Sequence, residues 1–456
     1  MSNERNVRKS SKMEILKYSF GGVGSNISFA LIMSYLMFFY TDIFGISALS
    51  VGSLFLLSRL IDAVTDPLMG MLSDRTRSKY GKYRPWIIFT TPFLALNVIL
   101  MFSTFDMTSG QKVVYAYVTY IMYSLLSTMV NIPYHSLTPV MSEDSSQRTD
   151  IASAKQIMAI PANLFVAVGT LPLVNLFGGG ASGWQKFAIL VAALTIISFW
   201  LCAWGAKRHD VINEDELSGK REKISFKSQI NIIIKNKPLL LLMAAFGIQM
   251  LALAASNSVN MYYMTYNVGR ADLVPVIGLI GTLAAVPIAV MIPVFSRKVD
   301  KKKIFIFGNA LSAVACIWLF LTPVSNVTVV MIASICITAF GQISGIIGWA
   351  MLPDCVDYAQ WKLGVSGAGT VSSSLTFINK CGMAFGGLIA GSVMSTVGYV
   401  AGVEQTATVL SSISLLRSMV PAMAYIISAA IIAFYPITNA SFKAIIEDIK
   451  SRETTV

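Results

Sequence analysis

Charged residues are scarce in this chain: Asp, Glu, Lys and Arg make up only 13% of its 456 residues. Soluble globular proteins carry about 25% charged residues, so this composition excludes that class. Hydrophobic residues make up 55% of the chain, and the mean hydropathy is +0.66. We therefore predict an all-α membrane protein that crosses the bilayer many times.

Histidine and cysteine are also rare, and their spacing excludes several kinds of site. The chain has two His and five Cys, and no two Cys form a CxxC pair. Neither a disulfide framework nor a Cys/His metal site is therefore expected, and no cofactor is implied. One His, His209, lies in a polar stretch, and no nucleophile and base are paired in the sequence. We do not expect an enzyme.

Apolar segments of about 20 residues or more are long enough to cross a bilayer as helices. The sequence contains twelve, at 16–41, 47–72, 85–105, 111–141, 151–177, 183–206, 238–266, 273–296, 303–323, 326–353, 366–398 and 406–436. An even number of spans places both termini on the same side of the membrane.

Lys and Arg are concentrated in alternate connections between these spans. They cluster in the N-terminal tail, in the central polar stretch and in the loops after the second and eighth spans. Because positive residues favour the cytoplasmic side, we predict that both termini are cytoplasmic. We also expect a location in the cell membrane and a prokaryotic origin. The net charge of +12 thus has a membrane explanation. It implies no nucleic-acid partner, and no obligatory protein partner is inferred beside the lipid bilayer.

The central polar stretch divides the spans into two sets of six. We predict a tail at 1–15, a bundle at 16–206, a cytoplasmic linker at 207–237, a second bundle at 238–437 and a tail at 438–456. The two sets resemble each other, since a basic turn follows the second span of each and a Pro followed by acidic residues ends the fourth. Parallel six-helix repeats are typical of transporters whose bundles rock around a site at the midplane.

Three charged residues lie inside the second span. Arg59, Asp62 and Asp66 have the spacing that places them along one face of a helix. A charge at bilayer depth costs about 2.5 kcal/mol or more, so we interpret this segment as a functional site. Two carboxylates suit a small monovalent cation or a shared proton. The alternative is a structural Arg–Asp pair, which accounts for only one of the two Asp.

Several polar motifs together carry a family resemblance. They are Gly70-x-x-x-Asp74-Arg75, Tyr40-Thr-Asp42-Ile-Phe-Gly45, Asp62-Ala-Val-Thr-Asp66-Pro67-Leu-Met-Gly70, Tyr80-Gly-Lys-Tyr-Arg-Pro-Trp86, Asn131-Ile-Pro-Tyr134 and Asp354-Cys-Val-Asp357-Tyr358. The chain resembles the melibiose permease-like family, the glycoside-pentoside-hexuronide cation symporters of the major facilitator superfamily. The resemblance implies twelve transmembrane helices in two pseudo-symmetric six-helix bundles. It also implies symport of a glycoside, pentoside or hexuronide with Na⁺ or H⁺ as the coupling ion, by alternating access.

The resemblance further implies a cation site between the second and fourth spans. Asp62 and Asp66 match the paired acidic ligands of the family and would be the metal ligands if the ion is Na⁺. Thr65 and Thr128 match the neighbouring polar ligands. For Thr128 the alternative is a hydroxyl bonded to a carbonyl of its own helix.

The substrate side departs from the melibiose permease. The matching positions carry the residues Asn26, Asn131, His135, Lys155, Gln156 and Lys380. Two of these are amides where that permease has acidic residues, so its galactoside preference does not carry over, although an amide still bonds sugar hydroxyls. The loss of two negative charges also makes an anionic sugar such as a glucuronide easier to accept. His135 has an alternative as a packing residue, and Lys380 has one as a cation that reaches the membrane interface.

A gating role is expected for Arg59 and for charges at the cytoplasmic ends of helices. The end charges are Asp74, Arg75, Asp354 and Asp357. Charge pairs at these ends would hold one state and break in the other. For Asp357 the alternative is a solvated charge.

The function classes left open are a carrier of a lipid-like or other non-sugar molecule, an uncoupled uniporter, and a membrane enzyme or receptor. The sequence does not rank the glycosides or choose the ion.

Overall fold

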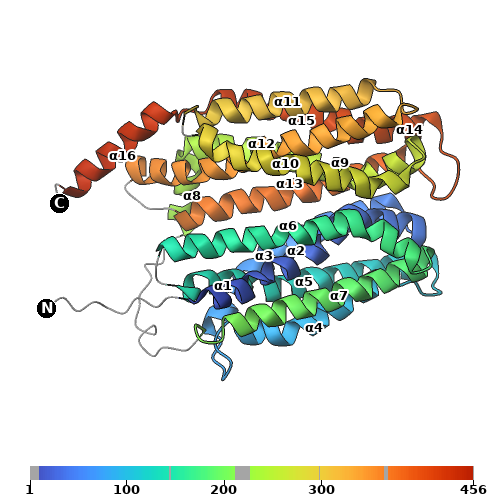
Figure 1. The fold of residues 1–456 in the computed structure, drawn as a ribbon, viewed down its shortest axis with the longest axis horizontal. Coiled ribbons are helices and arrows are strands. Elements are labelled where there is room, and N and C mark those ends of the chain that lie inside the picture. Colours follow the sequence, from blue (N-terminus) through green and yellow to red (C-terminus); the bar gives the residue numbers. More distant parts are fainter. Residues whose placement is uncertain (1–9, 143–144, 211–225, 297, 364–367, 455–456) are drawn as a thin grey trace. The chain divides into compact units, whose positions relative to one another are not determined.

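The structure is a computed structural model that describes residues 10–142, 145–210, 226–296, 298–363 and 368–454. Every regular element in these residues is a helix (Figure 1). Helices satisfy all backbone hydrogen bonds within one segment, which is what a segment surrounded by lipid requires.

The first half of the chain contains the predicted first to sixth spans. Its elements are α1 (Lys12–Ser19), α2 (Gly21–Leu31), the π-helical segments η1 (Ile32–Leu36) and η2 (Phe39–Ile43), α3 (Ala48–Arg75), α4 (Arg84–Met101), α5 (Ser109–Met141), α6 (Ser145–Leu176) and α7 (Gly180–Gly205).

The second half contains the remaining spans and two further helices. Its elements are α8 (Phe226–Lys235), α9 (Lys237–Tyr262), η4 (Tyr263–Asn267), η5 (Ala271–Leu273), α10 (Val274–Ser296), α11 (Lys301–Leu321), α12 (Val327–Leu363), α13 (Ala368–Thr396), α14 (Ala407–Ser414), η6 (Leu415–Met419), α15 (Val420–Ala433) and α16 (Asn439–Thr454).

The helices agree with the predicted spans. Eleven helices within the described ranges are long and apolar enough to cross a membrane. The expected first span, 16–41, is also helical, but it consists of α1, α2, η1 and η2 in succession rather than one regular helix. The prediction of an all-α membrane protein is confirmed.

Three features differ from the sequence-based expectation. Helix α12 continues to Leu363, ten residues past the expected end at Pro353, because a proline within a membrane helix is tolerated when neighbouring groups bond the backbone it frees. Helices α8 and α16 lie in segments expected to be a linker and a tail. Both segments are too polar or too short to register as spans, so hydropathy alone did not reveal them.

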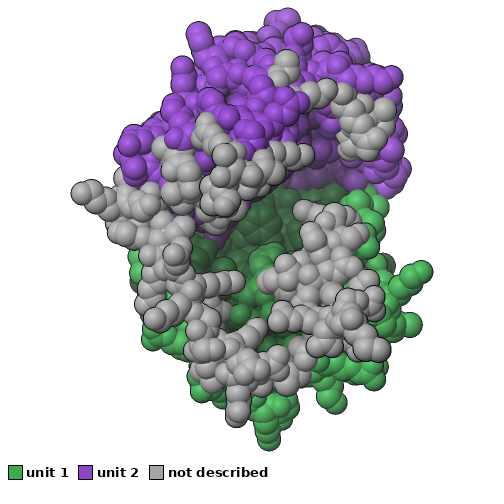
Figure 2. All heavy atoms as spheres, turned by 90° about the vertical axis from the view of Figure 1, so that its left-hand side faces the viewer, with its two compact units in different colours: residues 1–219 green, residues 220–456 purple. Residues whose placement is uncertain are grey.

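The chain forms two compact units, residues 1–219 and residues 220–456 (Figure 2). Each has its own core. In the first unit, Trp184 stacks on Phe102 with ring centroids 5.8 Å apart, and Phe39 packs against both. In the second, Phe246 is fully buried and packs against Phe305.

In the first unit, the segment after α7 is fastened to the start of α4. The buried carboxylate of Asp210 accepts the backbone N–H groups of Lys82, Tyr83 and Arg84 at 3.0, 2.9 and 2.8 Å. A carboxylate is favoured there because unpaired N–H groups and the helix dipole make a helix start positive. Gly81 has φ +103°, and a Cβ at this position would collide with the backbone oxygen of Asp210. Only glycine fits this position well.

The second unit has a related contact in which the two partners have exchanged places. Asp300 directly precedes α11, and its Oδ1 accepts the backbone N–H of Asn439, at the start of α16, at 2.9 Å. Its Oδ2 lies 3.6 Å from the Lys303 ammonium. The carboxylate here belongs to the loop before the helix, not to the segment after the last span.

Candidate ion and substrate site

Helices α3 and α5 pair two carboxylates with two hydroxyls. Thr128 donates to Asp66 Oδ1 at 2.9 Å, and Ser124 donates a short hydrogen bond to Asp62 Oδ1. In both pairs the partners are 62 residues apart in sequence. A constant separation is what two parallel helices in register produce, and residues four apart share a helix face. The two helices therefore present four oxygen-bearing side chains along one seam.

Asp62 is also part of an ion pair. Arg59 Nη1 donates to Asp62 Oδ2 at 2.8 Å, and the two side chains are 15% and 5% exposed. The carboxylate of Asp62 thus has a partner on each oxygen. This is the structural Arg–Asp pair considered above, and it occupies Asp62 but not Asp66, which is half-buried and bonded by Thr128.

The two threonines of the expected cation site differ. The Thr128 hydroxyl donates across to Asp66, whereas the Thr65 hydroxyl donates to the carbonyl of Ile61 in its own helix at 3.1 Å. Sequence reasoning did not single out Ser124, because a serine in an apolar helix is common. Its position four residues before Thr128 is the signal that could have revealed it.

The donor set fits a small monovalent ion. Within the described residues, no group of three or more His, Cys, Asp and Glu could hold a metal ion. Carboxylate and hydroxyl oxygens are hard ligands of the kind that alkali and alkaline-earth cations prefer. Two neighbouring carboxylates can also share one proton, since each disfavours the charge of the other.

Lys155 on α6 is the centre of a second polar group in the first unit. Its ammonium donates to the Thr138 hydroxyl at 3.1 Å, lies 3.3 Å from His135 Nδ1, and sits 4.3 Å from the ring centre of Tyr134. All these partners belong to α5, and none is a carboxylate. The His135 side chain is exposed, which does not favour a purely packing role. Tyr18 joins the group by donating to the Tyr134 carbonyl at 2.8 Å.

The two asparagines expected at the substrate site bond to their own helices. Asn26 Nδ2 donates to the Gly22 carbonyl at 2.8 Å, and Asn131 Nδ2 donates to the carbonyl and hydroxyl of Ser127, both at 3.0 Å. Asn131 Oδ1 is buried and has no hydrogen-bond partner in the described residues. Buried acceptors are nearly always bonded, so this oxygen is open to a donor such as a sugar hydroxyl. The side chain of Gln156 lies outside the described part of the structure.

The remaining expected residues lie in other places. Lys380 is half-buried on α13 of the second unit, next to Asn379, whose buried Oδ1 has no hydrogen-bond partner there. Arg75 is exposed at the end of α3, and the side chain of Asp74 lies outside the described residues.

The two acidic residues of α12 are charges within the second unit. Asp354 is buried, and both of its oxygens accept from Lys301 Nζ, at 2.7 and 2.8 Å. Asp357 is half-buried one turn further on.

Arg417 is a charged residue that the sequence reasoning missed. It lies in η6 and is 8% exposed. Its Nε donates to Asn260 Oδ1 at 2.9 Å and its Nη1 to the Ser256 hydroxyl at 3.0 Å, both on α9. In the described residues it forms no ion pair. A lone Arg within an apolar span was the available signal.

A helical membrane protein with bonded charges inside its spans has the features of a multi-pass membrane transporter. Residues 17–439 match the family model described as MFS/sugar transport protein. The chain belongs to this family, in the glycoside-pentoside-hexuronide branch of the major facilitator superfamily, and it is a transporter and not an enzyme.

Curated relatives match over almost the whole chain. The chain is 33% identical over 454 residues to the uncharacterized symporter YnaJ of Bacillus subtilis, covering 98% of this chain and 96% of the relative. It is 34% identical to an isoprimeverose transporter of Lactiplantibacillus pentosus, covering 93% and 88%. It is 29% identical to a glucuronide carrier protein homolog of Escherichia coli, covering 96% and 95%.

Solved transporter structures share the fold. A bacterial homolog of the human lysosomal transporter Spinster, inward-facing and unoccupied, aligns with a TM-score of 0.69 at 13% identity, covering 96% of this chain and 99% of that one. The inward-open xylose transporter XylE of E. coli aligns with a TM-score of 0.64 at 11% identity, covering 93% and 96%. At these identities the likeness shows the fold alone.

Proposed function

We propose that this transporter couples the uptake of a sugar or glycoside to a cation, Na⁺ or H⁺, which Asp62 and Asp66 bind. The observation that carries the proposal is the in-register pairing of these carboxylates with Ser124 and Thr128. An ion at this seam changes the net charge between α3 and α5. A ligand shifts a conformational equilibrium only by its differential affinity for the two states, and a change of buried charge supplies such a difference.

The proposed substrate is a glycoside, pentoside or hexuronide. Among the described residues, the partners of the Lys155 cation are all neutral, and the buried carbonyl oxygen of Asn131 has no donor. A positive donor next to neutral hydrogen-bonding groups suits sugar hydroxyls and also the carboxylate of a hexuronide. Two of the relatives carry the names of such compounds, isoprimeverose and glucuronide.

Transport in this proposal proceeds by alternating access, with both termini on the cytoplasmic side. The support is the alternating distribution of Lys and Arg along the sequence and the two-unit organisation of the chain. Arg59, Asp354 and Asp357 act as charges whose environment changes between states. Lys380, on α13 of the second unit, acts as a substrate-binding residue.

The test of coupling is uptake into proteoliposomes under an imposed gradient of Na⁺ or H⁺, with a panel of labelled glycosides. Asp66→Asn is expected to abolish accumulation of the glycoside against its own concentration gradient, because an amide cannot change charge with ion occupancy. Thr65→Val is the matched control, since the Thr65 hydroxyl bonds its own helix. Full gradient-driven uptake by Asp66→Asn would reject the ion site. Uptake that ignores both gradients in the unaltered protein would identify a uniporter.

The test of the substrate side compares a glucuronide with the corresponding neutral glucoside. Lys155→Gln is expected to weaken glucuronide binding about tenfold more than glucoside binding, as loss of a charge-assisted hydrogen bond of about 1.5 kcal/mol predicts. Binding is measured by calorimetry on the purified protein. Equal losses for both ligands would show that Lys155 holds the helices together and does not distinguish a charged substrate from a neutral one.

A further inference from the structure

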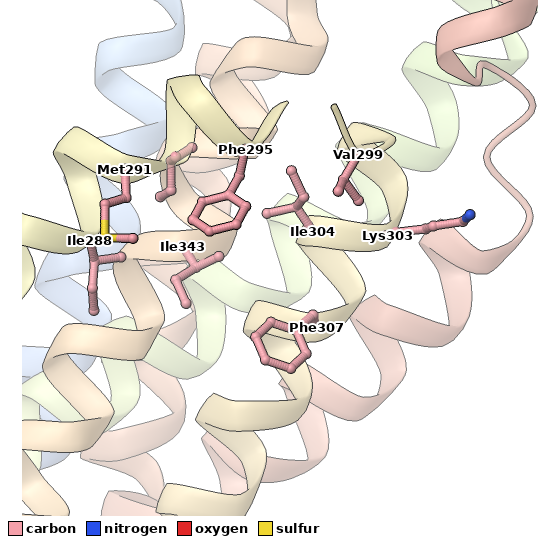
Figure 3. Close-up of a pocket in the computed structure, with 9 residues that line it drawn as sticks. Ile288, Met291, Phe295, Val299, Lys303, Ile304, Phe307 and Ile343 are labelled. Atoms are coloured by element: carbon pink, nitrogen blue, oxygen red, sulfur yellow. The ribbon is translucent and has the colours of Figure 1, made fainter. Parts of the chain in front are cut away.

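A groove lies between α10, α11 and α12 in the second unit (Figure 3). Its volume is about 410 Å³. Eight of its nine lining residues are apolar, and the ninth is Lys303. Figure 3 shows Ile288 and Met291 towards one end of the groove and the Lys303 ammonium at the other.

The packing of the helices explains why the groove exists. Ile288, Ile292 and Phe295 form an apolar stripe at spacings of four and three residues along α10. At Gly308 on α11, a Cβ would lie 2.6 Å from Ile343 Cγ2, so the missing side chain lets α11 approach α12. Ile343 therefore lines the groove where these helices meet. From Ile288 to Phe295 the groove follows α10 for about 10 Å, most of the roughly 15 Å hydrocarbon depth of one leaflet.

The helix that forms one wall has little protein around it. Only 17% of the α10 span is buried, against 28–50% for the other ten spans found in the described residues. Phe295 and Phe307 are 51% and 60% exposed. Within the second unit this surface is uncovered, and in a bilayer an uncovered apolar surface of a span is available to lipid chains. A hollow in that surface can hold one chain more tightly than a convex surface does.

The basic end of the groove is exposed and only weakly paired. The Lys303 side chain is 73% exposed, and its ion-pair partner Asp300 is 3.6 Å away. The other oxygen of Asp300 accepts the Asn439 N–H. Asp300 is thus a distant and shared partner, so the exposed Lys303 ammonium is only weakly paired. Lys303 lies where the basic loop after the eighth span meets the start of α11. Anionic headgroups collect at such basic segments next to the membrane.

We propose that this groove is a binding site for an anionic glycerophospholipid of the surrounding bilayer. One acyl chain lies in the groove along Ile288, Phe295 and Ile343, and the phosphate lies at Lys303. The apolar part extends over most of the hydrocarbon depth of one leaflet, and the charge at its end has the sign that selects an anionic headgroup over a zwitterionic one. The site is separate from the ion and sugar residues and does not depend on their assignment.

The test is lipid retention by the full-length protein, counted by native mass spectrometry after titration with phosphatidylglycerol or phosphatidylcholine of identical chains. The unaltered protein is expected to retain phosphatidylglycerol preferentially. Lys303→Gln should lower that preference about fivefold, in line with about 1 kcal/mol per basic residue near an anionic surface. Lys207→Gln, at an exposed lysine of the first unit, is the control and should leave the preference unchanged.

A second pair of variants tests the groove itself. Met291→Trp fills the groove from an exposed position, so it should reduce retention of both lipids. Val290→Trp places the same side chain on the same helix, at a residue that is 68% exposed and does not line the groove, and should have no effect. Equal retention of both lipids by the unaltered protein would overturn the proposal. Equal effects of Lys303→Gln and Lys207→Gln, or of the two Trp variants, would also overturn it.

Discussion

The two halves of the molecule hold their membrane charges in different ways. In the first half, Asp62 is bonded to Arg59 and to the Ser124 hydroxyl. In the second half, Arg417 is equally buried but is bonded to the neutral oxygens of Asn260 and Ser256. A carboxylate with adjustable partners can respond to an arriving cation, whereas a guanidinium remains charged at every physiological pH. This contrast supports the proposal that the cation site lies in the first half.

The halves also differ in the carboxylate contact near the start of the third span of each, which is α4 in the first half and α11 in the second. Asp210, from the segment after the last span, binds three N–H groups at the start of α4. In the second half the loop residue Asp300 binds one N–H, that of Asn439. Three charge-assisted bonds, two of them to buried groups, are worth more than one to a partly exposed group, so the first anchor is expected to be the stronger.

The largest expected effect comes from Asp62→Asn. It removes the carboxylate beside Arg59. The Arg59 cation is then buried without an opposite charge next to it, which costs about 3–5 kcal/mol. We expect loss of gradient-driven uptake and a lower thermal unfolding midpoint. The double variant Arg59→Gln with Asp62→Asn should recover the stability but not the uptake. If the double variant also recovers uptake, Asp62 serves structure alone and the contrast between the halves fails.

The next effect compares the two anchors. Asp210→Ala is expected to destabilise the protein by about 3 kcal/mol, because it leaves three backbone donors without an acceptor. Asp300→Ala should cost about 1 kcal/mol, since water can reach the partly buried N–H of Asn439. Thermal unfolding of both variants in the same detergent measures the difference. Equal costs would contradict the stronger anchor in the first half.

A smaller effect is expected from Arg417→Gln. The shorter amide does not reach both Asn260 and Ser256, so we expect a loss of about 2 kcal/mol from bonds to a charged donor. The dependence of uptake on Na⁺ and on pH should stay unchanged, because the proposed cation site lies in the other half. Parallel stability and uptake measurements check both parts. A shifted ion dependence would place Arg417 within the coupling machinery.

The smallest effect tests a single hydroxyl. Thr128→Val removes the donor to Asp66 but keeps the shape of the side chain, and is expected to weaken ion affinity about tenfold, or about 1.4 kcal/mol. Thr65→Val should leave the ion affinity unchanged. The ion concentration that gives half-maximal uptake is the measurement. Equal changes in the two variants would remove the distinction between the cross-helix and the within-helix threonine.

Sequence patterns predicted what depends on hydropathy and on helix periodicity. Eleven spans appear as helical segments of membrane length close to their expected places, and the face shared by Arg59, Asp62 and Asp66 is visible from spacing alone. The π-helical segments, such as η1 and η2 in the first span and η6 in the twelfth, were not predicted, because they depend on local packing.

Contacts between distant segments were not predictable in the same way. Nothing in the sequence near Asp210 indicates that it binds the loop before α4, because that pairing depends on the three-dimensional course of the chain. Ser124 and Arg417 were missed for a different reason, since each is one polar residue within an apolar helix and only its neighbours in space define its role. The asparagines Asn26 and Asn131 were identified by position, but their bonds to their own helices appear only in the structure.

The anchor at Asp210 determines where this transporter can be divided into two separately expressed fragments. A first fragment that ends at Ala206 contains all six of its spans, yet it lacks the carboxylate that holds the start of α4. One that ends at Gly219 keeps that carboxylate, together with the close contact between Gly81 and Asp210. Co-expression of matched fragment pairs should therefore restore uptake only when the break falls beyond Asp210, although both breaks lie in the same polar stretch.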